Sequence, residues 1–387
     1  MTPQLTINLS AIAANWRTLA ATHAGAAATG PSPGPSMTAA VVKADGYGLG
    51  ANRIAPYLLA AGARFFFVAQ LSEALALRPH LPRVPIAVLN GFDATQAGAY
   101  TTHALLPVLG SLGEIAAYQA YAAGSGHKLP ALLHIDTGMN RLGLSAAELA
   151  VAAGDHTRLA GIDWAYVMTH LASAEAPEDP VNARQASAFA AACARLPPMP
   201  RSIANSSGIF LGEAFRSDLA RPGAALYGIN PTPHAPNPMQ TVLRLTAPVL
   251  QIRDIAAGEG VGYNLSWTAS RPTRVATVAL GYADGYHRAA SNRAAAAFDG
   301  ARLPLIGRVS MDLTTFDATD QPNLHPGDHL ELIGPAIPPD ELASWSGTNG
   351  YEVLTSLRHR ALRVYTEAPL VQGGLGGAAS LHPTLLA

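Results

Sequence analysis

From about residue 39 to about residue 227, short apolar runs alternate with stretches rich in alanine and leucine. The runs have the length of buried strands and the stretches have that of helices, so the chain repeats a strand–helix unit. Eight such units favour a TIM-type (β/α)₈ barrel over an open doubly wound sheet, because no G-x-G-x-x-G fingerprint follows the first run. The predicted strands are Ala39–Lys43, Phe65–Ala69, Ile86–Asn90, Leu105–Leu109, Leu132–Asp136, Tyr166–His170, Arg201–Asn205 and Ala224–Tyr227, and helices are predicted at Leu9–Ala24, Asn52–Ala61, Leu112–Ala123, Ala146–Ala153 and Asn182–Arg195.

Near residue 231 the pattern changes. A proline-rich connector, Asn230–Asn237, is followed by short apolar runs that are separated by turn signals rather than by long helices. We therefore expect a barrel at residues 1–235, a mainly β C-terminal domain at 236–371 and a mobile Gly/Ala-rich tail at 372–387. The predicted strands of the β domain are Thr246–Ile255, Arg274–Leu280, Leu303–Arg308, Leu313–Asp317, His329–Ile333 and Ala361–Tyr365.

Lysine is rare in this chain. Of 25 basic residues only two, Lys43 and Lys128, are lysines. Lys128 lies in a polar loop, whereas Lys43 ends the first predicted strand and precedes a Gly/Asp turn. A desolvated lysine can lose its proton, which an arginine cannot do, and only the neutral amine attacks a carbonyl. Lys43 is thus a candidate Schiff-base lysine. The alternative is a strand-end lysine that reaches solvent or pairs with Asp45.

Polar side chains stand at the ends of several predicted strands. Lys43, His134 with Asp136, His170 and the pair Asn205-Ser206 all fall at such ends. The active site of a barrel of this type lies at the C-terminal ends of its strands, where the βα loops begin. A buried histidine alone has an ordinary structural explanation. Together, these positions predict a site.

The composition of the chain limits the classes of protein to which it can belong. Hydrophobic residues make up 49% of the chain and charged residues 13%, which suits a large buried core. The formal net charge of −1 predicts neither a nucleic-acid-binding surface nor a basic membrane-binding face. The single cysteine, Cys193, excludes an internal disulfide. No apolar run approaches about 18 residues, and the first residues lack the basic and apolar regions of a signal peptide, so we expect a cytoplasmic protein.

Six short motifs combine glycine with aromatic or charged residues, at Val41–Gly48, His134–Gly143, Arg221–Gly228, Val261–Asn264, Gly281–Tyr286 and Gly307–Asp312. In their order and spacing they resemble those of the alanine racemases, which are pyridoxal-phosphate enzymes with an N-terminal barrel and a C-terminal β domain. The resemblance spans about residues 3–366. It implies that the chain uses pyridoxal 5'-phosphate to interconvert L-alanine and D-alanine and supplies D-alanine for peptidoglycan. It also implies a homodimer whose active sites are shared between subunits, with no metal ion.

Racemisation needs one base on each face of the α-carbon, because one group removes the proton and the other returns one to the opposite side. By resemblance, Lys43 binds the cofactor covalently and is one base, and Tyr263, supplied by the β domain of the partner, is the other. A tyrosine, ordinarily with a pKa of about 10, acts as a base only if nearby cations stabilise its phenolate. The resemblance places His170 between Arg221 and this tyrosine. The structural alternative is a buried tyrosine at a Gly-rich turn.

The same resemblance assigns the remaining positions to the cofactor and the substrate. Arg221 faces the pyridine nitrogen, and because a permanent cation cannot take the pyridinium proton, the ring stays unprotonated and transamination is limited. Arg141 and the Met311 backbone lie near the substrate carboxylate, and Tyr282 and Asp312 line the pocket and its access route. The groups expected around the cofactor phosphate are Tyr47, Ser206, Gly223, Ala224 and Tyr351.

Three parts of these motifs depart from the family pattern. His134 stands where many members carry a carbamylated lysine that supports the substrate-binding arginine, so either another anion orients Arg141 or that support is absent. Asp45 and Leu49 replace an asparagine and a histidine, with little expected chemical effect. Ser310 replaces a small residue near the substrate carboxylate.

Three other functions stay open at this point. A metal-dependent hydrolase would use His134, Asp136 and His170 as ligands, although the first strand has no His-x-His pair. A non-catalytic pyridoxal-phosphate carrier would share the barrel but lack the second domain. A racemase acting on serine, lysine or arginine would share the motifs.

Overall fold

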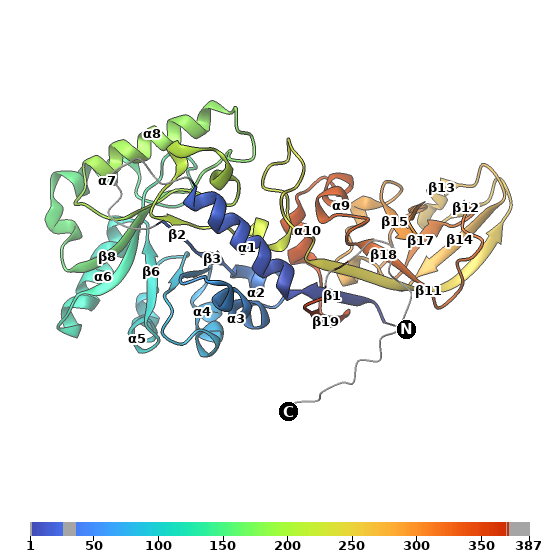
Figure 1. Cartoon of the computed structure of the whole chain (residues 1–387), viewed down its shortest axis with the longest axis horizontal. Coiled ribbons are helices and arrows are strands. Elements are labelled where there is room, and N and C mark those ends of the chain that lie inside the picture. The colour runs from blue at the N-terminus through green and yellow to red at the C-terminus, as the bar shows by residue number, and fades with distance from the viewer. Residues whose placement is uncertain (1, 26–35, 369, 371–387) are drawn as a thin grey trace. The chain divides into compact units, whose positions relative to one another are not determined.

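The computed structural model describes residues 2–25, 36–368 and 370, which form two compact units (Figure 1). Leu9–Gln240 form one, called here the barrel unit, and residues 2–8 with 241–368 form the other, called the β unit. The predicted tail at 372–387 lies outside the described residues. None of the helices in the described part of the chain is long and apolar enough to cross a membrane.

In the barrel unit, seven parallel strands follow one another in chain order from β3 to β9. β2 leads into β3 and pairs in parallel with β10. The N–H of Arg221, just after β10, donates to the carbonyl of Ala204, just after β9 (2.8 Å). β10 thus connects the last strand of the sheet to the first and supplies the eighth strand of the barrel. The strands are β2 (Met37–Thr38), β3 (Ala40–Val41), β4 (Phe66–Val68), β5 (Ile86–Val88), β6 (Leu105–Leu109), β7 (Leu129–His134), β8 (Ile162–Met168), β9 (Arg201–Ser202) and β10 (Leu219–Ala220).

Helices alternate with these strands (Figure 1). Local caps set their starts: Ser111 Oγ accepts the N–H of Glu114 (3.1 Å) at one helix, and Ser145 with Glu148 forms a capping box at the next. Each of the five predicted helices is present, within about two residues of its expected bounds. The helices are α1 (Leu9–Ala24), α2 (Lys43–Tyr47), α3 (Ala51–Ala61), α4 (Leu71–Leu77), α5 (Ala97–Thr102), α6 (Leu112–Ser125), α7 (Ala146–Gly154) and α8 (Pro180–Ala194).

The eighth strand was predicted in the wrong place. Ala224–Tyr227 forms a 3₁₀ turn, and the strand lies earlier, at Leu219–Ala220. Pro222 has no N–H for a strand ladder, so the extended backbone ends before the apolar run begins. Four apolar residues cannot by their pattern alone distinguish a strand from a buried turn.

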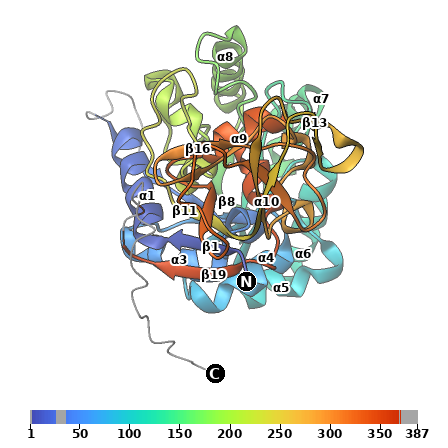
Figure 2. The same cartoon turned by 90° about the vertical axis from the view of Figure 1, so that its right-hand side faces the viewer.

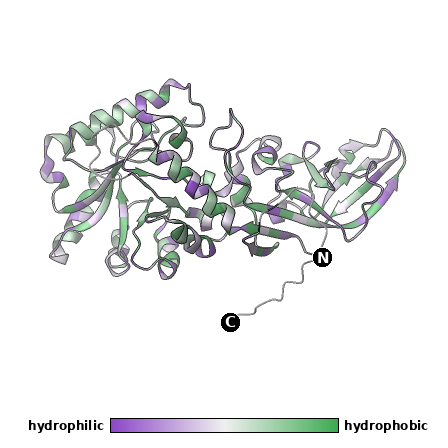
Figure 3. Ribbon diagram, in the orientation of Figure 1, coloured by the Kyte–Doolittle hydropathy of each residue, from purple (hydrophilic) through white to green (hydrophobic). Residues whose placement is uncertain are grey.

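Alternate strand residues fill the barrel interior. One buried cluster contains Ala39 and Val41 of the first strand, Phe65 and Phe67 of the next, and matching positions such as Leu132. In the later strands, intervening residues such as Ala131, Leu133 and Val167 join a second cluster with residues of the outer helices. Figure 3 shows the apolar residues running along the strands. Because successive side chains point to opposite faces of a strand, this alternation predicts which residues beyond each strand end face inward.

The β unit is built on one sheet, ordered β16-β15-β18-β11-β1-β19, with β14 pairing β11 and β17 pairing β14. β1 (Gln4–Asn8) runs antiparallel to β11 (Leu243–Ile255) and parallel to β19 (Leu362–Thr366). Residues 2–8, which we expected in the barrel, therefore belong to this sheet. The remaining strands are β12 (Gly260–Val261), β13 (Trp267–Thr268), β14 (Thr273–Val278), β15 (Ala295–Phe298), β16 (Ala301–Pro304), β17 (Thr314–Asp317) and β18 (His329–Ile333).

Each predicted strand of the β domain overlaps a strand of the structure, but two helices were missed. α9 (Pro339–Ser346) and α10 (Gly350–Ser356) lie side by side (Figure 2). Proline at the start of α9 and the Asn349 cap of α10 mark where they begin. Two turns of helix contain too few residues to establish a 3.6-residue period.

Candidate active site

The predicted site residues of the barrel unit continue the inward-facing positions of its strands. Lys43 follows Val41 by two residues, His134 follows Leu132, His170 follows Met168 and Arg221 follows Leu219, and each of these preceding residues belongs to the interior cluster. Side chains two residues apart along a strand share a face. The four polar side chains lie near one another, since the charge of Arg221 lowers the pKa of both histidines and Lys43 also acts on His170.

Lys43 begins a tight turn in which Ala44, Asp45 and Gly46 all have positive φ. The carboxylate of Glu73 holds this turn by accepting the N–H of Ala44 (2.7 Å). Asp45 accepts the N–H of a residue in α3 (2.8 Å), and none of the ion pairs found in the described part of the chain includes Lys43. A Lys43–Asp45 ion pair, the structural alternative, is therefore wrong.

The Lys43 amine is held in conditions that favour its neutral form. Burial lowers the pKa of Lys43, and the positive charge of Arg141 lowers it further, against a smaller opposing effect of Glu73. A neutral amine can attack a carbonyl or accept a proton. Burial and Arg141 thus both shift the pKa of Lys43 in the direction expected of a Schiff-base lysine.

Arg221 is a buried cation held from two sides. Only 4% of the residue is exposed. One guanidinium N–H donates to Ser202 Oγ, and another donates to the carbonyl of Thr169 (2.6 Å). Burial lowers the pKa of Arg221 to about 10, so the side chain remains charged at neutral pH.

The two histidines of the site are neutral. Burial, and next the charge of Arg221, lower the pKa of His134 to about 4. Burial also lowers the pKa of His170 well below its usual range, with Arg221 the largest of the cations that add to this effect. No group of three or more His, Cys, Asp or Glu side chains in the described residues could hold a metal ion.

Arg141 lies on an exposed loop that Asp136 shapes. One oxygen of Asp136 accepts the N–H groups of Gly138 (2.9 Å) and Met139 (3.0 Å). None of the ion pairs among the described residues includes Arg141. Among the described residues, no carboxylate therefore pairs with Arg141, and its binding of a substrate carboxylate stays a prediction.

Gly223, Ser206 and Tyr47 lie together near the end of β10. A Cβ on Gly223 would overlap the Tyr47 hydroxyl, so only glycine permits this approach. Ser206 Oγ accepts the N–H groups of Gly223 (3.0 Å) and Ala225 (3.2 Å), which leaves its own hydrogen to donate. The ring of Tyr47 stacks on Tyr227, with centroids 4.6 Å apart. The hydroxyls of Tyr47 and Ser206 are groups that suit a phosphate, so these residues fit the phosphate of a pyridoxal phosphate.

Loops of the β unit carry most of the remaining predicted residues. Gly262, which precedes Tyr263, lies close to Arg308. A Cβ added to Gly262 would lie 3.0 Å from the backbone nitrogen of Arg308. The N–H of Tyr282 donates to the carbonyl of Ser310 (3.0 Å). The motifs beginning at residues 261, 281 and 307 are therefore neighbours within this unit.

These loops present their side chains at the surface. Tyr263 is 66% exposed, which contradicts the alternative of a buried structural tyrosine. Met311 is 53% exposed, and Asp312 forms an ion pair with Arg360 (2.8 Å). The structure thus gathers Lys43, Tyr47, Arg141, His170, Ser206, Arg221, Gly223 and Ala224 in the barrel unit, has Tyr263, Tyr282, Met311 and Asp312 on loops of the β unit, and has Tyr351 on α10.

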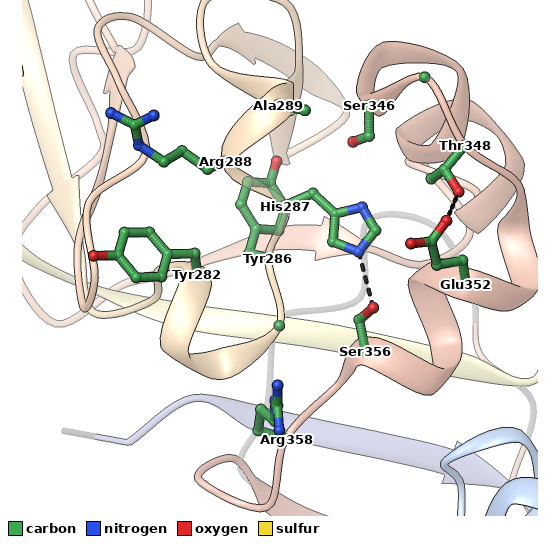
Figure 4. A pocket seen from close by; sticks show the side chains of 12 residues that line it. Tyr282, Tyr286, His287, Arg288, Ala289, Ser346, Thr348, Glu352, Ser356 and Arg358 are labelled. Carbon is green, nitrogen blue, oxygen red and sulfur yellow. Dashed lines mark hydrogen bonds between the residues drawn. The ribbon is translucent and has the colours of Figure 1, made fainter.

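A polar pocket of about 440 Å³ lies in the β unit, lined by residues 282–289 and by α9, α10 and the residues that follow them (Figure 4). His287 Nε2 lies 3.0 Å from Ser356 Oγ across it. Tyr286 is fully buried in its wall, which raises the pKa of its hydroxyl. Tyr282 is the one predicted site residue that lines this pocket, which is built from the β unit alone.

The buried polar residues that form hydrogen bonds to the site residues and their loops were not predicted from the sequence. Ser202 and Thr169 bind Arg221, and Gln185 on α8 bonds to the loop after β8. A signal for Gln185 was present in the sequence, since it shares the buried stripe of its helix with Phe189. An amide on such a stripe needs buried hydrogen-bond partners.

Known proteins and family models match nearly the whole length of the chain. The family model described as alanine racemase, N-terminal domain, matches residues 7–231, and the model for the C-terminal domain of alanine racemase matches residues 242–365. An alanine racemase from Acidiphilium cryptum is 54% identical over 94% of this chain and 98% of that protein. A catabolic alanine racemase from Mesorhizobium japonicum is 46% identical over 93% of this chain and 92% of that protein.

Solved structures give the same result. The alanine racemase from Bartonella henselae with covalently bound pyridoxal phosphate has a TM-score of 0.89 and 42% identity, covering 95% of this chain and all (100%) of that one. The biosynthetic alanine racemase from Pseudomonas aeruginosa has a TM-score of 0.86 and 33% identity, covering 94% of this chain and 99% of that one.

Proposed function

The chain belongs to the alanine racemase family, and we propose that it racemises alanine with two bases, Lys43 and Tyr263. Membership makes it a pyridoxal-phosphate-dependent isomerase that interconverts L-alanine and D-alanine. The expected barrel and β domain are confirmed, and the carrier without a second domain is excluded. The observation that carries the two-base proposal is the partly buried Lys43 amine at a strand end, whose pKa is lowered by burial and by Arg141.

Pyridoxal phosphate, when bound, supplies an electron-withdrawing ring that makes the α-proton of the amino acid acidic. Lys43 would hold it covalently. Arg221 would face the ring nitrogen as a cation that cannot accept a proton from it. The buried hydrogen bonds of Arg221 support this role, since they fix the guanidinium in one orientation. The residues that would bind the phosphate are Tyr47, Ser206, Gly223, Ala224 and Tyr351.

The two bases work in opposite protonation states. In one direction the neutral Nζ of Lys43 removes the α-proton, while the hydroxyl of Tyr263 donates a proton to the other face. In the reverse direction the phenolate removes the proton and the ammonium donates one. A phenol is a weak acid, so a cation must stabilise the phenolate. Arg221, acting through His170, would supply that charge.

The remaining residues orient the substrate. Arg141 would bind the substrate carboxylate together with the backbone of Met311. It is suited to this because it has a planar pair of donors and pairs with no carboxylate among the described residues. Tyr282 and Asp312 would line the access route. Holding the carboxylate fixes the α-carbon between the two bases.

We also propose a homodimer with shared active sites. Several large apolar side chains are exposed on the loops of the β unit, among them Tyr263, Leu265, Tyr282, Met311 and Leu313. Exposed apolar groups gathered in neighbouring loops are typical of surfaces that another chain covers. In this proposal Tyr263 reaches the barrel of the partner, as the two-base scheme requires.

The biological role follows as a further proposal. D-Alanine made by the enzyme would supply peptidoglycan synthesis, in the cytoplasm. Relatives of the chain carry both biosynthetic and catabolic descriptions, so degradation of D-alanine is the alternative role. The expected absence of nucleic-acid and membrane partners stays a prediction.

The function is tested by incubating the purified protein, loaded with pyridoxal phosphate, with L-alanine, L-serine, L-lysine and L-arginine. We expect L-alanine to lose its optical activity fastest. Reduction with borohydride should then link the cofactor to Lys43, and peptide mapping distinguishes this from Lys128, the other lysine of the chain. Faster loss with another amino acid would contradict the preference for alanine, and a cofactor on Lys128 would contradict the site.

His134→Lys is expected to create an amine that takes up carbon dioxide. The position is 9% exposed, and the cations Arg141 and Arg221 that act on His134 would favour both a neutral lysine and its carbamate anion. Bicarbonate should therefore raise the activity and the Tm of this variant and leave wild type unchanged. The mass of the intact variant, measured with and without bicarbonate, gives a direct check. A crystal structure with a bare amine directed away from Arg141 would contradict the expectation.

A further inference from the structure

Gln185 is a buried amide on α8 that bonds two loops at the active end of the barrel unit. The residue is 1% exposed. Its Nε2 donates to Thr137 Oγ1 (3.1 Å) and to the carbonyl of His170 (2.9 Å). Its Oε1 accepts the N–H of Ala172 (2.8 Å). Both donors and the oxygen are thus bonded, as burial requires.

The neighbours of this amide determine its orientation. The backbone N–H of Ala172 can only donate and the carbonyl of His170 can only accept, so the oxygen and the nitrogen of Gln185 cannot exchange places. Thr137 Oγ1, which accepts from Gln185, also lies 2.7 Å from Thr169 Oγ1, and either hydroxyl can donate in this second bond. One side chain on an outer helix thus begins a short chain of hydrogen bonds.

This chain of bonds reaches the proposed catalytic residues. Thr137 lies in the loop that carries Arg141. Thr169, its hydroxyl partner, gives its backbone carbonyl to Arg221 (2.6 Å). Gln185 therefore connects the segment that binds the substrate carboxylate with the segment that holds the buried cation and the adjoining histidine.

We propose that Gln185 is a positioning residue of the racemase, which holds the Arg141 loop in place relative to Arg221. The inference rests on the proposed roles of these two residues. An exposed loop would otherwise be held mainly by its own turn, and a displacement of about 1 Å near the reacting atoms costs up to about a hundredfold in rate. Because Gln185 lies on a helix outside the strands, it acts through the two loops.

The test compares Gln185→Met with Asn182→Leu. Methionine keeps the length of glutamine but has no donor. Asn182 is a matched control, because it is 3% exposed on the same helix and donates to the carbonyls of Ser173 (3.2 Å) and Ala176 (2.8 Å), away from the Arg141 loop. We expect Gln185→Met to raise the KM for alanine about tenfold, to lower kcat, and to speed amide hydrogen exchange at residues 137–143. Asn182→Leu should lower the Tm but leave KM and that exchange within about twofold of wild type.

Thr137→Val provides a second route if Gln185→Met does not fold. It removes one hydroxyl with little change in shape and breaks the same chain of bonds from the loop side, so KM and loop exchange should change in the same direction. The loss in transition-state stabilisation, measured from kcat/KM, should then be smaller for the double variant than the sum of the losses for the two single variants. Equal effects of Gln185→Met and Asn182→Leu on KM, or an unchanged KM and exchange in Gln185→Met, would overturn the proposal. An inactive wild type would instead remove the proposed function, while the exchange data would still report on the loop.

Discussion

Lys43→Ala and Tyr263→Ala are each expected to be nearly inactive, and a mixture of the two is expected to regain about a quarter of wild-type activity once subunits exchange. Loss of an acid–base group costs about a hundredfold to ten-thousandfold. If Tyr263 acts at the barrel of its partner, a mixed dimer collects both changes in one site and leaves the other site intact. Random pairing makes about half of the dimers mixed, each with one good site of two.

The control for this experiment is a mixture of Lys43→Ala with Arg141→Ala. Both residues belong to the barrel unit, so every site of that mixed dimer carries one damaging change and no activity should return. Subunit exchange is confirmed separately with tagged chains, and racemisation is measured in the same samples. If exchange occurs and the Lys43→Ala and Tyr263→Ala mixture stays at the level of its parents, Tyr263 does not complete the site of a partner.

Arg221→Glu is expected to racemise alanine at least about tenfold more slowly and to release more pyruvate by transamination. The guanidinium cannot accept a proton from the ring nitrogen of the cofactor, whereas a carboxylate pairs with a protonated one and favours the side reaction. D-Alanine and pyruvate are measured in the same reaction, so the ratio of the two products reports the change even if less enzyme is active.

The buried setting of Arg221 also predicts a loss of stability. A glutamate cannot donate to the carbonyl of Thr169, and leaving this buried acceptor without a donor costs about 1–3 kcal/mol of unfolding free energy. Arg221→Lys is the matched control, because it keeps a cation and a donor, and it should form less pyruvate than the glutamate variant. A folded Arg221→Glu enzyme with the wild-type product ratio would contradict the assigned role of Arg221.

The regular alternation of residue types was sufficient to predict most of the barrel and the position of Lys43. A strand that ends in a lysine and a Gly/Asp turn has few other structures to adopt, and the interior positions Ala39 and Val41 already indicate the face that Lys43 shares. The eighth strand was misplaced because only two residues, Leu219 and Ala220, are extended. A segment of that length has no measurable period.

Other features depend on contacts that no local pattern contains. The roles of Arg221 and Tyr263 came from motif resemblance, whereas the partners that hold Arg221 became visible only in three dimensions. Gln185 is the clearest example of a residue whose contacts the sequence alone does not reveal. Its place on a buried helical stripe could be recognised, but its bonds join residues 13 to 48 positions away along the chain.

The position of β1 has a consequence for synthesis of the chain. This strand leaves the ribosome before the barrel unit, whereas its two neighbours, β11 and β19, are made only after the whole barrel unit. The barrel unit is thus an insertion between the first strand of a sheet and the rest of that sheet. Closing so long a connection costs entropy before any contact is gained, so the sheet is expected to complete late. Until then, the apolar side chains of Leu5 and Ile7, both fully buried in the finished protein, stay exposed on the growing chain.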